Sequence, residues 1–171
     1  MSAFLLSQLL IAIAIVLDLI SFQFKQKRFI VTCLALSCML SGAHFALLEQ
    51  WTAAALMWLA CVRYFVTIFS HARSLLALFL TLNCVMTYFT FAGILSLVSF
   101  AGSSMQTIAT FSKSDRHLRL LMIVGTSIWL LNNLLVGSPM AALMEFAFLC
   151  SNIIGYYRYY GIRLRLAKEE A

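Results

Sequence analysis

Four ionisable side chains interrupt the long apolar runs of this 171-residue chain: Asp18, His44, Arg63 and Glu145. If the runs cross a membrane, such groups are costly there and usually face the interior of a helix bundle or a wet cavity. Carboxyl and imidazole groups exchange protons, and a planar guanidinium holds polar ligands through several donors at once. Five amides extend this set of polar positions: Asn83, Gln106, Asn132, Asn133 and Asn152.

Asp18 and Arg63 form the first candidate pair. At 1.5 Å per residue, Asp18 lies about 9 Å and Arg63 about 10 Å from the cytoplasmic ends that we expect for their helices. Their similar depth makes a charge pair geometrically feasible. One interpretation is a neutralising pair that locks three helices together, and the other is a gate or clamp that holds a polar solute.

The last apolar run carries polar residues at every seventh position: Ser138, Glu145, Asn152 and Tyr159. Seven residues are nearly two helical turns, so these side chains share one face. A row of polar groups in a membrane needs water or a ligand beside it, and we therefore expect this face to line a cavity. Glu145 is then either a proton-coupling site or a hydrogen-bonding group between helices.

Three stripes of small polar residues favour helix packing over ligand binding, because such residues let membrane helices approach closely. The stripes are Ser37, Ser41 and His44, then Asn83, Thr87 and Thr90, then Ser99, Ser103, Gln106 and Thr110. We expect these positions to be structural, except for His44, which the internal repeat described below singles out.

The elements that must position all these residues are membrane helices. Hydrophobic residues make up 63% of the chain, charged residues 11%, and the mean hydropathy is +0.97, outside the composition of soluble domains. We expect one polytopic membrane domain over residues 1–171. The net charge of +6 suits loops that face anionic lipid on one side, and no nucleic-acid partner is expected.

Enzymatic chemistry finds no support in the sequence. The chain has no HExxH, CxxC or phosphate-loop motif, its His, Cys and carboxylates lack metal-ligand spacing, and no nucleophile–base pair is evident. Since no lysine lies within an expected span, a retinal-type Schiff base is excluded as well. We therefore expect no enzyme activity, no metal and no cofactor.

Seven apolar runs predict seven transmembrane helices. The expected spans are Ala3–Phe24, Phe29–Leu48, Trp51–Phe69, Leu75–Phe91, Ile94–Phe111, Leu118–Val136 and Pro139–Tyr160. Eleven of the twelve Lys and Arg residues cluster in every second gap and at the C-terminal end, namely in 25–28, at Arg73, in 113–119 and in 158–168. Cytoplasmic loops concentrate such residues, so we predict an outside N-terminus and a cytoplasmic C-terminus.

A shift of 89 residues lays the first three expected helices on the last three without a gap. The pairs that then meet are Lys27 with Arg116, His44 with Asn133, Arg63 with Asn152, and Cys61 with Cys150. Because one helix intervenes, both triplets start outside. We therefore predict two parallel three-helix repeats in a 3-1-3 arrangement, residues 3–73 and 93–160, with a linker helix at 74–92 and a cytoplasmic tail at 161–171.

Several short stretches carry a family resemblance: Ser21-Phe22, Lys27-Arg28-Phe29, GAHFALL at 42–48, Arg63, WLLNN at 129–133, Gly137-Ser138, Glu145, Asn152 and Arg158. With these residues the chain resembles the YgjV family of bacterial inner-membrane proteins over nearly its whole length. The resemblance implies a multi-pass protein of that membrane. The family pattern leads us to expect a His directly before Asn133, and the Asn132 that stands there argues against proton transfer at this position.

The family is in turn similar to the SWEET/PQ-loop (MtN3-like) superfamily, which has the same 3-1-3 layout and an outside N-terminus. In those sugar carriers, aromatic and Asn side chains from the third helix of each triplet line a central site. The resemblance implicates Asn152 and, at the matching position, Arg63, where an arginine would suit a solute with an anionic group. The Pro-Gln turn that names the superfamily is absent from the first helices, so this step is an analogy of fold.

We therefore expect a SWEET-like carrier that moves a small polar solute by alternating access. The expected site residues are Arg63 and Asn152 at the centre, Trp129, His44 and Asn133 along the outer path, and Glu145 and Asp18 as proton-coupling or gating groups. The alternative is a non-transporting receptor or scaffold protein of the same fold. Membrane lipids are the other expected partners, and a homo-oligomer is compatible with the sequence.

Overall fold

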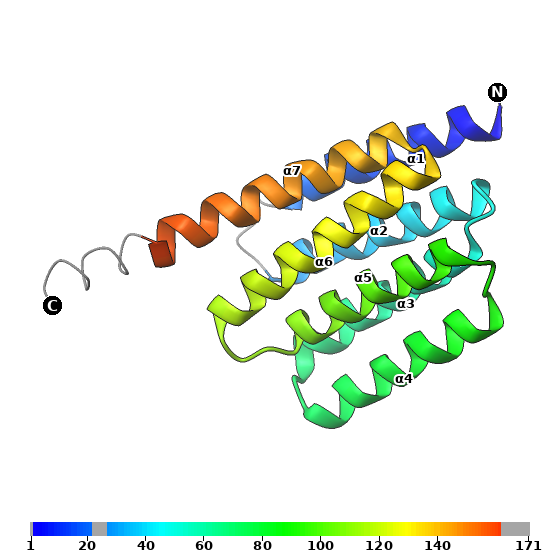
Figure 1. The fold of residues 1–171 in the computed structure, drawn as a ribbon. Helices are drawn as coiled ribbons and strands as arrows, with labels where there is room; N and C mark the ends of the chain where they lie inside the picture. The colour runs from blue at the N-terminus through cyan, green and yellow to red at the C-terminus, as the bar shows by residue number, and fades with distance from the viewer. Residues whose placement is uncertain (1, 22–26, 162–171) are drawn as a thin grey trace, which may run out of the picture.

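Helices account for nearly all of the described structure. The computed structural model describes residues 2–21 and 27–161, and seven α-helices form within these ranges (Figure 1). They are α1 (Ala3–Ser21), α2 (Lys27–Leu47), α3 (Trp51–Phe69), α4 (Arg73–Phe89), α5 (Ile94–Thr110), α6 (Asp115–Val136) and α7 (Pro139–Tyr156), and a π-helical turn (Tyr157–Gly161) follows α7. Lys25 and the tail residues Arg163, Arg165 and Lys168 lie outside the described residues.

The helix boundaries follow local chemistry. The sequence places the start of the sixth helix at Leu118, but α6 starts at Asp115, because the Ser114 hydroxyl caps it by accepting from the His117 N–H at 3.5 Å. At the other end, Gly137 has φ 73°, a left-handed conformation that ends α6 at little steric cost. Pro139 then opens α7, where its missing N–H leaves no intrahelical bond unmade.

Four helical segments are long and apolar enough to cross a membrane: Ala3–Ile20, Trp51–Phe69, Asp115–Val136 and Pro139–Tyr160. Three shorter apolar segments lie within the other helices, Thr32–Leu47 in α2, Arg73–Phe89 in α4 and Ile94–Thr110 in α5. The expectation of an all-helical membrane protein is thus confirmed at the level of seven helices, four of them of spanning length and composition.

The helices form two layers. In one layer α2 packs between α1 and α3, and in the other α6 packs between α5 and α7. The layers meet along two seams, where α1 contacts α7 and where α3 contacts α5, while α4 packs outside against α5 and α3 (Figure 1). We call the end of the bundle where α7 begins the Pro139 end. The opposite end, where Arg73, Lys113 and Arg158 lie, is the basic end.

Close approach of α2 and α3 depends on Gly42. A Cβ atom built on Gly42 would lie 2.1 Å from the indole nitrogen of Trp58, and that nitrogen donates to the Met39 carbonyl at 3.3 Å. The Trp58 ring therefore occupies the space that any larger residue at position 42 needs. Small residues commonly allow such close packing between membrane helices.

We expect Gly42→Ala to lower the apparent melting temperature of the purified protein, because overpacking costs about 1–3 kcal/mol. Gly155→Ala is the matched control. It brings the same gain in helix propensity, but its new methyl meets only the flexible end of the Arg119 side chain. Equal melting temperatures for the two variants would show that the Trp58 contact does not limit the approach of α2 and α3.

Candidate functional site

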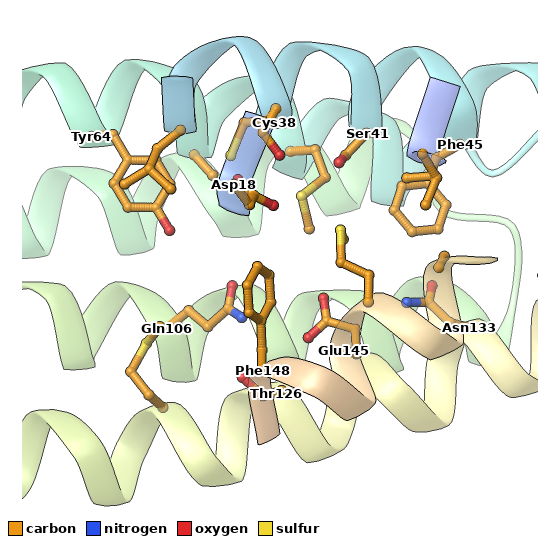
Figure 2. A pocket seen from close by; sticks show the side chains of 18 of the residues that line it. Asp18, Cys38, Ser41, Phe45, Tyr64, Gln106, Thr126, Asn133, Glu145 and Phe148 are labelled. Atoms are coloured by element: carbon orange, nitrogen blue, oxygen red, sulfur yellow. The ribbon is translucent and has the colours of Figure 1, made fainter. Parts of the chain in front are cut away.

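A cavity of about 310 Å³ lies between the two layers (Figure 2). All helices except α4 contribute side chains to it. Its polar lining consists of Asp18, Ser37, Ser41, Arg63, Gln106, Thr126, Asn133, Glu145 and Asn152. Its apolar and aromatic lining includes Ile11, Leu34, Phe45, Met57, Tyr64, Met122, Met144 and Phe148. The volume is at the lower end of the range for small-molecule sites.

Five of the seven residues predicted from the sequence meet at this cavity: Asp18, Arg63, Asn133, Glu145 and Asn152. They come from α1, α3, α6 and α7, so the cavity joins positions far apart in the chain. Asp18 and Glu145 point into it from opposite layers (Figure 2). His44 and Trp129 are fully buried and do not belong to the cavity lining.

Arg63 is held by the opposite layer. Only 2% of its surface is exposed, and its Nη1 donates to the Thr107 hydroxyl of α5 across the α3–α5 seam. Thr107 also accepts from the Asn83 amide of α4 at 3.3 Å and donates to the Ser103 carbonyl at 2.7 Å. This chain of contacts fixes one side of the guanidinium and links α4 to the site.

Asp18 is held within its own layer, since the Ser37 side chain of α2 hydrogen-bonds its carboxyl group. The charge pair that similar depth suggested does not form, because no salt bridge joins Asp18 to Arg63 in the part of the chain that the structure describes. Glu145 lies across the α1–α7 seam, and the two carboxyl groups repel each other when both are ionised.

Three lining residues keep a buried polar atom without a protein partner within the described residues: Arg63 Nε, Asn133 Oδ1 and Glu145 Oε2. Each of these three residues is at least nine-tenths buried. Buried polar groups in native proteins are nearly always hydrogen-bonded to protein or water, so these three atoms leave hydrogen-bonding capacity unused beside the cavity. A cavity with such polar groups in its lining is better suited to water or a polar ligand than to being empty.

His44 ties helices together at the Pro139 end. Its Nδ1 lies 2.9 Å from the Ser7 carbonyl oxygen of α1, and its Nε2 lies 3.2 Å from the Ser138 hydroxyl before α7. Gln8 completes the cluster, because its Nε2 donates to Ser138 Oγ at 3.2 Å and its Oε1 accepts from the Met140 N–H at 3.1 Å. These contacts join α1, α2 and the start of α7 at the Pro139 end of the bundle.

Trp129 packs in the core of the bundle. Its ring lies 5.6 Å from the Phe45 ring between centroids, and the absent side chain of Gly102 leaves room for the indole. Phe45 itself lines the cavity, so Trp129 supports the cavity wall from behind. The indole N–H has no partner among the described residues.

A family model described as a bacterial inner membrane protein, Imp-YgjV, matches residues 5–163. The chain belongs to the YgjV family. It is 25% identical to the inner membrane protein YgjV of Escherichia coli strain K12 over 165 residues, which cover 96% of this chain and 90% of that protein. No solved structure matches the chain. With several apolar helices, this YgjV-family member is a protein of the bacterial inner membrane.

Several lining residues of this YgjV-family protein were not identified as site residues from the sequence. Ser37, Ser41 and Gln106 were interpreted as helix-packing positions, but they line the cavity. Thr126, which also lines the cavity, and Thr107, which holds Arg63 without lining the cavity, were not singled out at all. A signal for both exists, because the 89-residue shift superposes Asp18 on Thr107 and Ser37 on Thr126.

We expect Thr107→Val to destabilise the protein by about 1–3 kcal/mol, because Arg63 and Asn83 each lose a buried hydrogen-bond partner. Thermal unfolding of the purified protein measures the effect. Thr110→Val is the matched control, since the Thr110 hydroxyl bonds only the Gln106 carbonyl of its own helix. A loss no larger than that of the control would mean that Thr107 does not hold Arg63.

Proposed function

We propose that this protein carries a small polar solute across the inner membrane by alternating access. The observation that supports the proposal most directly is the interlayer cavity, where buried Arg63, Asn133 and Glu145 each keep a polar atom without a partner among the residues that the structure describes. Unmet polar groups at membrane depth are typical of solute pathways. The solute and the surrounding lipid are the partners we propose, and the cycle requires no catalytic step.

We propose that all seven helices cross the membrane, with the basic end in the cytoplasm and the N-terminus outside. Each helix exposes at least one large apolar side chain, as a lipid-facing surface requires: Leu19, Leu36, Val62, Leu78, Leu97, Leu131 and Leu143. Arg73, Lys113, Arg116, Arg119 and Arg158 all lie at the basic end, in agreement with the rule that cytoplasmic loops concentrate positive charge.

We further propose that α1–α3 and α5–α7 are parallel repeats joined by α4. The pattern of helix contacts supports a two-fold relation, because exchanging the triplets maps the α1–α7 seam onto the α3–α5 seam. Polar positions also correspond under the 89-residue shift: Asp18 with Thr107, Ser37 with Thr126, His44 with Asn133, and Arg63 with Asn152. This 3-1-3 layout is the one that the SWEET/PQ-loop resemblance implies, with Arg63 and Asn152 at the central site.

Contacts at the Pro139 end support a gate there. The α1–α7 seam is closed by the cluster of Gln8, His44 and Ser138. At the α3–α5 seam, Thr52 Oγ1 lies 2.7 Å from the Thr90 carbonyl oxygen and 2.8 Å from Ser96 Oγ. Both seams are thus hydrogen-bonded at the same end, and a carrier that opens outward must break these few polar contacts.

We expect proteoliposomes containing the protein to take up a solute saturably, and Arg63→Ala or Asn152→Ala to abolish that uptake. Asn152 is the cleaner test, because its amide donates only to the Phe148 carbonyl of its own helix, at 3.0 Å. Ser127→Ala is the matched control, since this exposed hydroxyl also bonds only its own helix, at the Ile123 carbonyl. Size-exclusion profiles verify that each variant is folded.

Unchanged uptake in both variants would remove Arg63 and Asn152 from the central site. A protein that binds solutes but never moves them would be a receptor rather than a carrier. A partner protein that co-purifies in place of solute binding would instead indicate a scaffold.

The orientation makes a separate prediction. A reporter that is active only in the cytoplasm should be active when fused after Ala171, because seven spans would put the termini on opposite sides and the basic clusters favour a cytoplasmic C-terminus. A matched fusion in the Gly137–Ser138 turn, at the opposite end of α7, should be silent. The reverse pattern in well-expressed fusions would overturn the orientation.

A further inference from the structure

The cavity of the proposed carrier is lined by one guanidinium and two carboxyl groups, which come from the helices of different seams. Arg63 belongs to the α3–α5 seam, where it donates to Thr107. Asp18 and Glu145 belong to α1 and α7, which form the other seam. The cavity thus has a guanidinium from one seam and two carboxyl groups from the other.

The unmet hydrogen bonds divide in the same way. Among the described residues, the atom of Arg63 without a partner is a donor, Nε, and those of Glu145 and Asn133 are acceptors, Oε2 and Oδ1. They also differ in depth, because Glu145 is six residues and Arg63 twelve residues from helix starts at the Pro139 end. At 1.5 Å per residue, their Cα atoms differ in depth by about 9 Å.

We propose that the ligand of this cavity is an amino-acid-sized zwitterion with an apolar body, bound with its carboxylate at Arg63 and its ammonium at Glu145 and Asn133. Arginine matches carboxylates geometrically, and an ammonium group offers three donors to the acceptors on the other side. Phe45, Met57 and Phe148 surround the body of the ligand. The inference rests on the proposed function for its cavity, but it can be tested without transport.

The size and lining of the cavity set limits on other ligands. At about 30 Å³ per water molecule, 310 Å³ holds about ten waters, which suits one small molecule and no large one. A simple organic anion would satisfy Arg63 but would leave Glu145 and Asn133 without a donor. An amine would satisfy the two acceptors but would meet the fixed charge of Arg63.

The test compares matched probes on the purified full-length protein. L-leucine, L-phenylalanine and 6-aminohexanoate are each paired with the analogue that lacks the amine and with the analogue that lacks the carboxylate, and glucose serves as the neutral probe. Ligand-dependent thermal shifts give the apparent affinities. We expect at least one zwitterion to bind at least tenfold more tightly than glucose and than either of its own analogues. The two charged groups are closer together in leucine than in 6-aminohexanoate, so comparing these two affinities indicates the spacing that the cavity prefers.

Two variants test where the two charged ends of the ligand bind. Glu145→Gln, which preserves shape, should weaken zwitterion binding at least tenfold and leave the analogue without the amine unchanged. Arg63→Gln should also weaken zwitterion binding at least tenfold, but it should leave the affinity for the analogue without the carboxylate unchanged. If Arg63→Gln does not fold, Glu145→Gln still decides, because its effect depends on the presence of the amine. Ser127→Ala should change none of the affinities.

The inference fails if glucose or an analogue with a single charge binds as tightly as every zwitterion, if no probe binds, or if Glu145→Gln leaves zwitterion affinity unchanged. Its failure is distinguishable from that of the carrier. Arg63-dependent uptake of a sugar would keep the carrier and reject the zwitterion. Specific zwitterion binding without uptake into proteoliposomes would keep the site and reject the carrier.

Discussion

The buried guanidinium of Arg63 is the constraint on which the arrangement of the layers depends. A cation taken out of water is costly unless protein groups replace its hydration, and only 2% of Arg63 is exposed. Its Nη1 donates to Thr107 of α5, which belongs to the other layer. The two layers must therefore approach at the α3–α5 seam. Asn83 extends the requirement to α4, which packs outside both layers and would otherwise have no link to the cavity.

The cavity follows from how the layers meet. They are joined at their edges by the α1–α7 and α3–α5 seams, while the central helices α2 and α6 lie across the space between. Long, flexible Met side chains and aromatic rings fill this space incompletely, which leaves room among Met57, Met144 and Phe148. At the Pro139 end, polar clusters join the edges of the two layers. The proposed carrier thus depends on the same geometry for its cavity and for the contacts proposed as a gate.

Much of the helical framework could be predicted from the sequence, because it depends on local chemistry. Apolar runs separated by turn residues define the helices, and Gly137-Ser138-Pro139 marks the last turn within the spacing that capping requires. The start of α6 at Asp115 was missed because the expected span was drawn by hydropathy, while the Ser114 cap extends the helix through charged residues. The start of α2 at Lys27 is likewise earlier than the Phe29 expected from hydropathy.

The candidate site was less predictable, since it depends on which face of each helix meets the other layer. A helix that is apolar on most sides gives little indication of its buried face, so Ser37 and Gln106 were not distinguishable from packing residues. Depth alone made a pair between Asp18 and Arg63 feasible. The depth of a residue along its helix does not indicate the seam at which its side chain lies. Asp18 and Arg63 belong to different seams.

The separation of these charges has a consequence for a protein built from two repeats. Under the proposed repeat, Arg63 corresponds to Asn152 and Asp18 to Thr107, so each charge has a neutral partner in the other half. In the fold, Arg63 meets Thr107 at one seam, and the corresponding seam brings together the helices of Asn152 and Asp18. A two-fold scaffold would by itself give a cavity with equal sides. Placing the guanidinium and the carboxyl groups at non-equivalent positions removes that equality, so the proposed zwitterion would bind in only one direction.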